Sequence, residues 1–230
     1  MDKILLMLQL QASLNDATNG EKWTDGITKN GRHINWKRCI YMECAEMIDS
    51  FSWKHWKSLN QAADWDNLQI EVVDVWHFII SLAIENYSQT LRGGIDELAV
   101  DIADLESFSK IDTKSNIFAS QDDVIAKVED IMLHSLGKEE LNLEKLISDF
   151  FDLVIMSGLD LETLYKLYVG KNILNQFRQD NGYKDGTYIK VWAGEEDNVV
   201  MKRVWQENEN IKPDMLYKEL TKSYLELNRS

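Results

Sequence analysis

An all-α protein is the fold class that this sequence predicts, and three observations favour it. The 230-residue chain contains one proline, Pro213, and only 11 glycines. Because both residue types break helices, a chain so poor in them is typical of long helices. Apolar residues also recur at helical spacing along most of the chain. The length suits one domain, or one domain with a sizeable insertion, and is sufficient to bury a large core.

The helices follow in order from apolar periodicity and from stop and cap signals. Residues 2–17 form an amphipathic helix that ends at an Asn-Gly stop signal. Residues 36–51 are apolar over much of the helix circumference, so we expect deep burial. Asp66 is the expected cap of the helix at 66–88. Further helical stretches are expected at 95–107, 121–136, 142–157, 161–180 and, interrupted before Pro213, about 196–228.

The character of the chain changes over about 88–140. Serine and asparagine interrupt weaker amphipathic stretches there, and no residues with site chemistry appear. We interpret 1–230 as a single domain in which about 88–140 is an inserted, covering helical segment.

Charge and apolar runs limit the partners. The net charge is −14, from 39 acidic and 25 basic residues. This disfavours a nucleic-acid polymer or an anionic membrane surface as partner, but not a nucleotide. We see no uninterrupted run of about 18 apolar residues and no signal peptide, so we expect a soluble, cytoplasmic protein outside the membrane. Cys39 and Cys44 are expected to be buried free thiols in a reducing compartment.

Two pairs of carboxylates are the most informative feature: Glu43 with Glu46, and Glu71 with Asp74. Each pair is spaced i, i+3, which places both side chains on one face of a helix. Both pairs lie in apolar stretches, where a carboxylate is costly to bury unless it is neutralised. On two packed helices, four such charges would repel one another and require a cation. Oxygen ligands favour Mg²⁺, with Mn²⁺ as the alternative. The other interpretation, open at this point, is two solvated acidic faces.

A local set of cations is the second feature, within residues 171–198. Asn175 and Arg178 share one helix face and precede a glycine-hinged loop that carries Lys184 and Lys190. In a chain this acidic, cations on a flexible loop suit a polyphosphate. The alternative is an ordinary solvated turn between helices.

Four ordered motifs carry a resemblance to a known family. They are residues 10–16 (LQASLND), 36–46 (WKRCIYMECAE) with 53–57 (WKHWK), 71–78 (EVVDVWHF) and 175–198. The chain resembles the dimeric, all-α dUTPases of kinetoplastids, of Campylobacter-type bacteria and of some phages. The resemblance covers most of the chain except about 88–140, and the acidic positions all match. It implies a helical bundle of the all-α nucleoside triphosphate pyrophosphatase type, a homodimer, and Mg²⁺-dependent hydrolysis of dUTP to dUMP and pyrophosphate. The same enzymes also accept dUDP, and they limit uracil incorporation into DNA.

The resemblance also assigns roles to individual residues. It implies that Glu43, Glu46, Glu71 and Asp74 are metal ligands, and that Glu46 also orients or deprotonates the attacking water.

Further roles concern the nucleotide. Gln11 and Asn15 would read the uracil edge, Phe78 would stack on the deoxyribose and exclude a 2′-hydroxyl, and Asn175 would hold the 3′-hydroxyl. Candidates for phosphate contacts are Lys171, Arg178, Lys184 and Lys190. Candidates for the base pocket are Trp53 and Trp56, and a place in the core is at least as good an interpretation of these two tryptophans.

Two other functions stay open from the sequence. One is a related pyrophosphatase acting on dCTP or a damaged nucleotide. The other is a non-enzymatic, acidic helical binding protein whose carboxylates are solvated.

Overall fold

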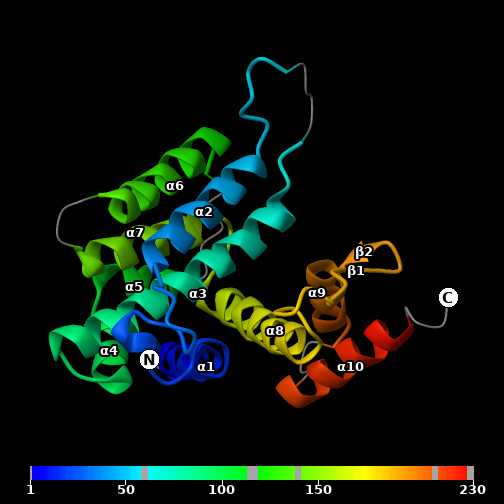
Figure 1. Ribbon diagram of the computed structural model, residues 1–230. Helices are drawn as coiled ribbons and strands as arrows, with labels where there is room; N and C mark the ends of the chain where they lie inside the picture. The colour runs from blue at the N-terminus through cyan, green and yellow to red at the C-terminus, as the bar shows by residue number, and fades with distance from the viewer. Residues whose placement is uncertain (1, 58–61, 113–118, 138–140, 209–211, 227–230) are drawn as a thin grey trace. The chain divides into compact units, whose positions relative to one another are not determined.

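The computed structural model describes residues 2–57, 62–112, 119–137, 141–208 and 212–226, and it is mostly helical (Figure 1). This confirms the predicted all-α class. In chain order the elements are α1 (Asp2–Asn19), the 3₁₀ turn η1 (Trp23–Asp25), α2 (Trp36–Asp49), α3 (Trp65–Thr90), α4 (Ile95–Ala103), α5 (Glu106–Ile111), α6 (Gln121–Leu136), α7 (Leu143–Met156), α8 (Leu161–Asp180), β1 (Val191–Trp192), β2 (Glu195–Glu196), α9 (Asp197–Glu207) and α10 (Pro213–Glu226).

The chain divides into two compact units, Met1–Tyr165 and Lys166–Ser230. In the first unit, α2 packs against both α3 and α6, and α7 packs against α3, α5 and α6. The α1 helix lies against α3 and α4. Within 88–140, therefore, α6 directly supports the helix that carries Glu43 and Glu46. The interpretation of 88–140 as an insertion into a single domain stays a prediction.

Aromatic stacking holds the centre of the first unit. The Trp76 ring on α3 stacks on Phe150 of α7, with centroids 4.7 Å apart and ring planes at 8°. Both side chains are fully buried, as are Leu68 and Ile79 on α3. Burying such side chains contributes roughly 1.5–3 kcal/mol each, so this contact fixes α3 against the bundle.

The start of α3 differs from the sequence prediction. The cap is Asp64, whose carboxylate accepts a hydrogen bond from the Asn67 backbone N–H at 2.9 Å. Asp66 lies in the first helical turn instead, where a negative charge favours the helix dipole. By length and composition α3 could span a membrane, but 78% of its most apolar window is buried in the protein. That burial identifies α3 as a core helix.

The second unit contains the C-terminal part of α8, the β1–β2 ribbon, α9 and α10. Phe177 contacts the rings of Trp192, Tyr217 and Tyr224 edge-on. Gly170 allows α8 to approach α9 closely, because a Cβ there would lie 2.7 Å from the Met201 sulfur. The ribbon, in which Val191 pairs with Glu196, was not predicted, because two-residue strands leave no periodic pattern.

Candidate metal and nucleotide site

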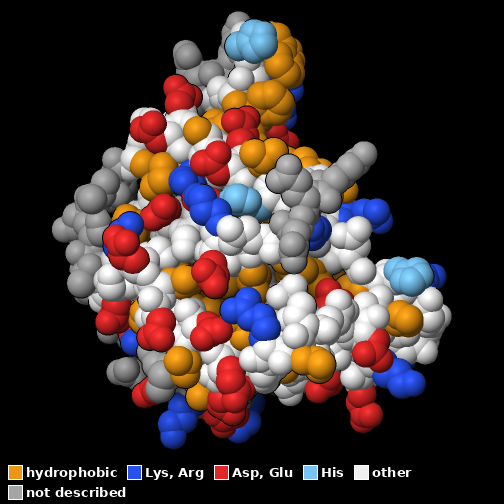
Figure 2. Space-filling model, turned by 90° about the vertical axis from the view of Figure 1, so that its left-hand side faces the viewer, with side chains coloured by type: hydrophobic (Ala, Val, Ile, Leu, Met, Phe, Trp, Pro, Cys, Tyr) orange, Lys and Arg blue, Asp and Glu red, His pale blue; other side chains and the backbone are white. Residues whose placement is uncertain are grey.

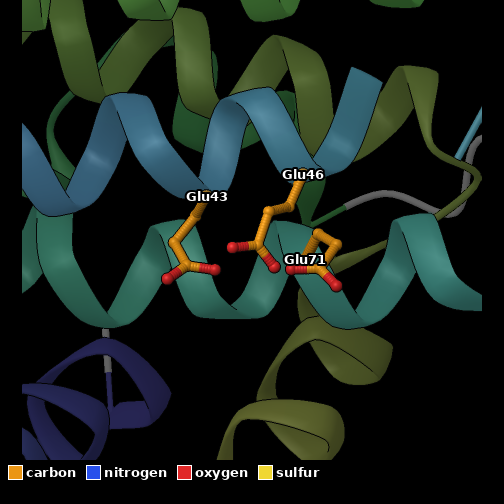
Figure 3. A group of neighbouring side chains, drawn as sticks. All are labelled: Glu43, Glu46 and Glu71. Atoms are coloured by element: carbon orange, nitrogen blue, oxygen red, sulfur yellow. The ribbon is translucent and has the colours of Figure 1, made fainter. Parts of the chain in front are cut away.

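Three of the four predicted metal ligands converge between α2 and α3. Glu43 and Glu46 lie one turn apart on α2, and Glu71 lies on the facing part of α3. One carboxylate oxygen from each residue lies within 4.8 Å of the other two. Figure 3 shows the three side chains approaching one another where the two helices meet. Helix pairing thus produces the cluster, because each helix alone places its carboxylates on only one side of the volume.

Exposure is graded across this acidic cluster. Glu71 is 9% exposed, Glu43 is half-buried and Glu46 is exposed. Two carboxylates at this separation repel by roughly 3 kcal/mol at an effective dielectric constant of about 20. A divalent cation would remove that repulsion, and three carboxylates without nitrogen or sulfur ligands suit Mg²⁺ or Mn²⁺. Glu46 is the member of the cluster that water reaches most easily.

Asp74 lies one turn after Glu71 on α3 and is half-buried. It is outside the group of three carboxylates that lie within 4.8 Å of one another. Three residues of helix correspond to about 4.5 Å of rise, which displaces Asp74 along α3 from Glu71. Its predicted role as a fourth ligand stays a prediction.

The two predicted base-reading amides lie together on α1. Gln11 and Asn15 are buried, and the Gln11 Nε2 donates to the Asn15 Oδ1 at 3.0 Å. The Asn15 Nδ2 then donates to the Ser81 hydroxyl at 3.0 Å, and the Gln11 Oε1 lies 2.6 Å from the His77 Nδ1. The amides therefore belong to a buried network with α3, the helix of Glu71.

His77 and Ser81 were not predicted from the sequence. Their i, i+4 spacing on α3 matches the i, i+4 spacing of Gln11 and Asn15 on α1. This match is the sequence feature that could have indicated that the two pairs face each other. A single buried histidine or serine carries no such signal by itself.

Phe78 contacts one tryptophan, which in turn contacts a second. Its ring stacks on Trp36 with centroids 6.1 Å apart and planes at 29°. Trp23 meets Trp36 edge-on at 6.1 Å, and its indole N–H donates to the Asp16 carboxylate at 2.8 Å. Trp36 and Trp23 were also missed, because the sequence gives no contact between residues so far apart in the chain.

Trp53 and Trp56 are not core residues. The alternative from the sequence, that these two tryptophans belong to the core, is therefore wrong. They are 42% and 62% exposed, on the loop that follows α2. This loop carries apolar side chains at the upper end of the space-filling view (Figure 2). The Trp53 indole N–H donates to Asp49 at 2.9 Å. A role of Trp53 at the base stays a prediction.

In the second unit, the Arg178 guanidinium is bound to protein groups. Its Nε and Nη2 donate to the two oxygens of Asp197, and its Nη1 donates to the Asn175 Oδ1 at 3.1 Å. The Lys171 Nζ donates to the Asn198 Oδ1 at 2.8 Å. The Arg178 Nη2 also donates to the Asn198 Oδ1 at 3.3 Å, so these groups form one partly buried network around α8 and the start of α9.

Lys184 and Lys190 lie on the exposed loop that follows α8. The Lys190 Nζ lies 5.7 Å from the centroid of the Tyr183 ring. Both lysines are accessible to an anionic ligand, and their phosphate contacts stay predictions.

One family model, described as dUTPase, matches residues 3–183, which is well over half of the chain. The match spans the acidic cluster, the amide network and the 88–140 stretch, and it ends before Lys184. Among curated proteins, none matches this chain.

Proposed function

Because the chain belongs to the dUTPase family, we propose that it hydrolyses dUTP to dUMP and pyrophosphate with Mg²⁺, and dUDP to dUMP and phosphate. The observation that carries the proposal is the convergence of Glu43, Glu46 and Glu71 between α2 and α3. Its effect in the cell would be to limit the uracil available for incorporation into DNA. We also propose that the protein acts as a homodimer in the cytoplasm.

Glu43, Glu46 and Glu71 would hold Mg²⁺, with Asp74 as a further ligand. When bound, Mg²⁺ would offset negative charge on the phosphates and would make the attacking water easier to deprotonate. Glu46 is exposed and offers a carboxylate oxygen to accept the proton of the attacking water. The water oxygen forms a new bond to phosphorus, and the bond between the α- and β-phosphates breaks. Pyrophosphate leaves from dUTP, and phosphate leaves from dUDP.

The nucleoside would be held by the groups around α1 and α3. Asn15 and Gln11 would meet the uracil edge, and Phe78 would pack on the deoxyribose. Asn175 would hold the sugar 3′-hydroxyl, and Lys171, Arg178, Lys184 and Lys190 are the groups proposed for the phosphates.

A panel of nucleotides tests this function. The purified protein is incubated with dUTP, dUDP, UTP, dTTP, dCTP and dATP, with Mg²⁺ or with excess chelator, and the products are separated by ion-exchange chromatography. We expect dUMP and pyrophosphate from dUTP, dUMP from dUDP, little turnover of the others, and no turnover with chelator. Equal turnover of dCTP and dUTP would contradict specificity for uracil and would indicate a pyrophosphatase with a broader choice of base. Release of orthophosphate as the first product from dUTP would contradict cleavage between the α- and β-phosphates.

A further inference from the structure

The buried network that joins α1 to α3 contains a fixed sequence of donors and acceptors. It starts at the backbone carbonyl of His77, which can only accept. The Ser81 hydroxyl donates its one proton to that carbonyl at 2.7 Å. The Ser81 oxygen can therefore only accept from Asn15, which lies 3.0 Å away. This requires the amide nitrogen of Asn15, not its oxygen, to face Ser81.

The same reasoning fixes the next two groups. With its nitrogen toward Ser81, Asn15 presents its oxygen to Gln11, so the Gln11 nitrogen must face Asn15 at 3.0 Å. The Gln11 oxygen then faces the Nδ1 of His77 at 2.6 Å. Since a carboxamide oxygen only accepts, the Nδ1 of His77 must carry a proton. Four hydrogen bonds thus determine both amide orientations and the protonated ring nitrogen.

Amide orientation decides which pyrimidine an asparagine can pair with. Uracil presents an N3–H donor beside a carbonyl acceptor, whereas cytosine presents an N3 acceptor beside an amino donor. A carboxamide pairs with either base, but only after a 180° flip that exchanges its oxygen and nitrogen. In its hydrogen bonds to Gln11 and Ser81, Asn15 uses one of its two N–H groups and one of its two oxygen lone pairs. As far as the described residues show, one donor and one acceptor of Asn15 are left for a base.

We propose that His77 and Ser81 are positioning residues that determine uracil specificity, because they hold the Asn15 and Gln11 amides in one orientation. This inference rests on the proposed function. A cytosine base would require both amides to flip. The flip would place two acceptors together at Ser81, and it would place two donors together at His77 as long as the ring proton stays on Nδ1. Leaving buried groups mismatched in this way costs about 1–3 kcal/mol each. Specificity would then come from residues that need not touch the base.

The test is the ratio of kcat/KM for dUTP to kcat/KM for dCTP. In Ser81→Ala the acceptor for Asn15 is gone, and we expect this ratio to fall about tenfold, the scale of one hydrogen bond. His77→Phe should lower the ratio similarly, and His77→Asn, which can place an amide N–H near the position of Nδ1, should restore it. A purely structural role for these residues predicts that both substrates lose activity by the same factor.

Ser135→Ala is the matched control. Ser135 is also buried in a helix, and its hydroxyl also donates to the carbonyl four residues earlier, at 3.1 Å to Ile131. We expect the substrate ratio to keep its wild-type value in this variant. A fall equal to that of Ser81→Ala would show that loosening a helix is sufficient and would overturn the proposal.

A second measurement does not depend on activity. Two-dimensional ¹H–¹⁵N spectra of the ¹⁵N-histidine-labelled protein, assigned with His77→Asn, report which ring nitrogen of His77 is protonated. We expect a proton on Nδ1. A neutral His77 ring protonated only at Nε2 would overturn the proposed order of donors and acceptors in the network, even if dUTP is the substrate. Failure of the wild-type protein to hydrolyse dUTP would overturn the proposed function and, with it, the role of His77 and Ser81 in specificity. The activity assay and the histidine spectrum therefore distinguish failure of the proposed function from failure of this inference.

Discussion

Arg178 and Asp197 form a buried, two-point ion pair. The Arg178 Nε lies 2.8 Å from one Asp197 oxygen, and its Nη2 lies 2.7 Å from the other. Burial acts to raise the pKa of Asp197, but the hydrogen bonds and charge of Arg178 outweigh burial and hold this pKa below its usual range. The same guanidinium donates to Asn175. Arg178 thus positions Asn175, the residue proposed to hold the sugar 3′-hydroxyl, and it also joins α8 to α9.

Replacing one partner of this pair should destabilise the second unit. In Asp197→Asn the Arg178 charge stays buried without its counter-charge, and we expect a loss of about 3 kcal/mol in the free energy of unfolding. Urea unfolding measures this loss. Arg203→Gln is the control, because its contact with Glu195 joins two exposed side chains and should contribute under about 1 kcal/mol. Equal effects of the two substitutions would contradict the structural importance of the buried pair.

The acidic cluster should behave as a metal site. Glu46→Gln and Glu71→Gln each remove one charge at nearly constant size, and we expect Mg²⁺-dependent turnover to fall by at least about 10²-fold. Asp74→Asn should show a similar loss if Asp74 is a fourth ligand. Glu129→Gln is the control, since Glu129 is exposed on α6. Turnover near the wild-type rate in all three site variants would end the metal-site interpretation.

The same variants should be more stable than the wild type without metal. Removing one of three carboxylates that lie within 4.8 Å of one another reduces their repulsion. We expect the melting temperature of Glu71→Gln to exceed that of the wild type in chelator, and the order to reverse in saturating Mg²⁺. A lower melting temperature in chelator would show that Glu71 stabilises the fold through its contacts instead.

Asp149 should make the first unit sensitive to acid. Burial acts to raise the pKa of this carboxylate, but hydrogen bonds from Lys145, His134 and Lys127 together lower it to about 2. Because the folded pKa lies below the ordinary value of 3.8, the stabilisation is complete above about pH 4 and is lost as pH falls toward 2. Asp149→Asn should remove about 2 kcal/mol or more of stability at pH 7 and flatten the stability profile between pH 4 and 2. An unchanged profile would contradict this.

Helices were predictable because their signals are local. The stretch 121–136 coincides with α6, and 161–180 coincides with α8. Glu43, Glu46 and Glu71 could be grouped because i, i+3 spacing fixes the helix face before any tertiary contact forms.

Contacts between distant helices were not predictable in the same way. The pairing of Arg178 with Asp197 joins residues 19 apart across a loop, and the Asn15–Ser81 hydrogen bond joins residues 66 apart. The counter-ion of Arg178 could not be identified from spacing, and the phosphate contact expected of Arg178 stays a prediction. The core alternative for Trp53 failed because apolar composition does not distinguish a buried loop from an exposed one.

Assembly is tested by dilution. The proposed homodimer should give twice the chain mass in light scattering at micromolar concentration. If the partner chain completes the site, specific activity should fall at the concentration where the dimer dissociates. A monomer at micromolar concentration would contradict the dimer.

The two cysteines of α2 should differ strongly in reactivity. Both are free thiols; Cys44 is fully buried and Cys39 is half-buried. Burial raises the pKa of the Cys44 thiol, and the nearby charge of Glu43 raises it further. Because the thiolate is the reactive form, Cys44 must both become exposed and ionise before it can react. We expect it to react with a maleimide at least about 100-fold more slowly than Cys39, as measured in the single variants Cys39→Ser and Cys44→Ser.

Labelling of Cys44 should also report on the acidic cluster one residue away. In Cys39→Ser, the remaining thiol can be modified only when α2 separates from its neighbours. Ligands that bind the closed bundle disfavour that opening by mass action. Mg²⁺ with a non-hydrolysable dUTP analogue should therefore slow the labelling of Cys44, whereas the analogue in chelator should not. In Cys39→Ser combined with Glu71→Gln this protection should be lost, because one metal ligand is missing. Equal protection with and without Mg²⁺ would contradict a metal bound between α2 and α3.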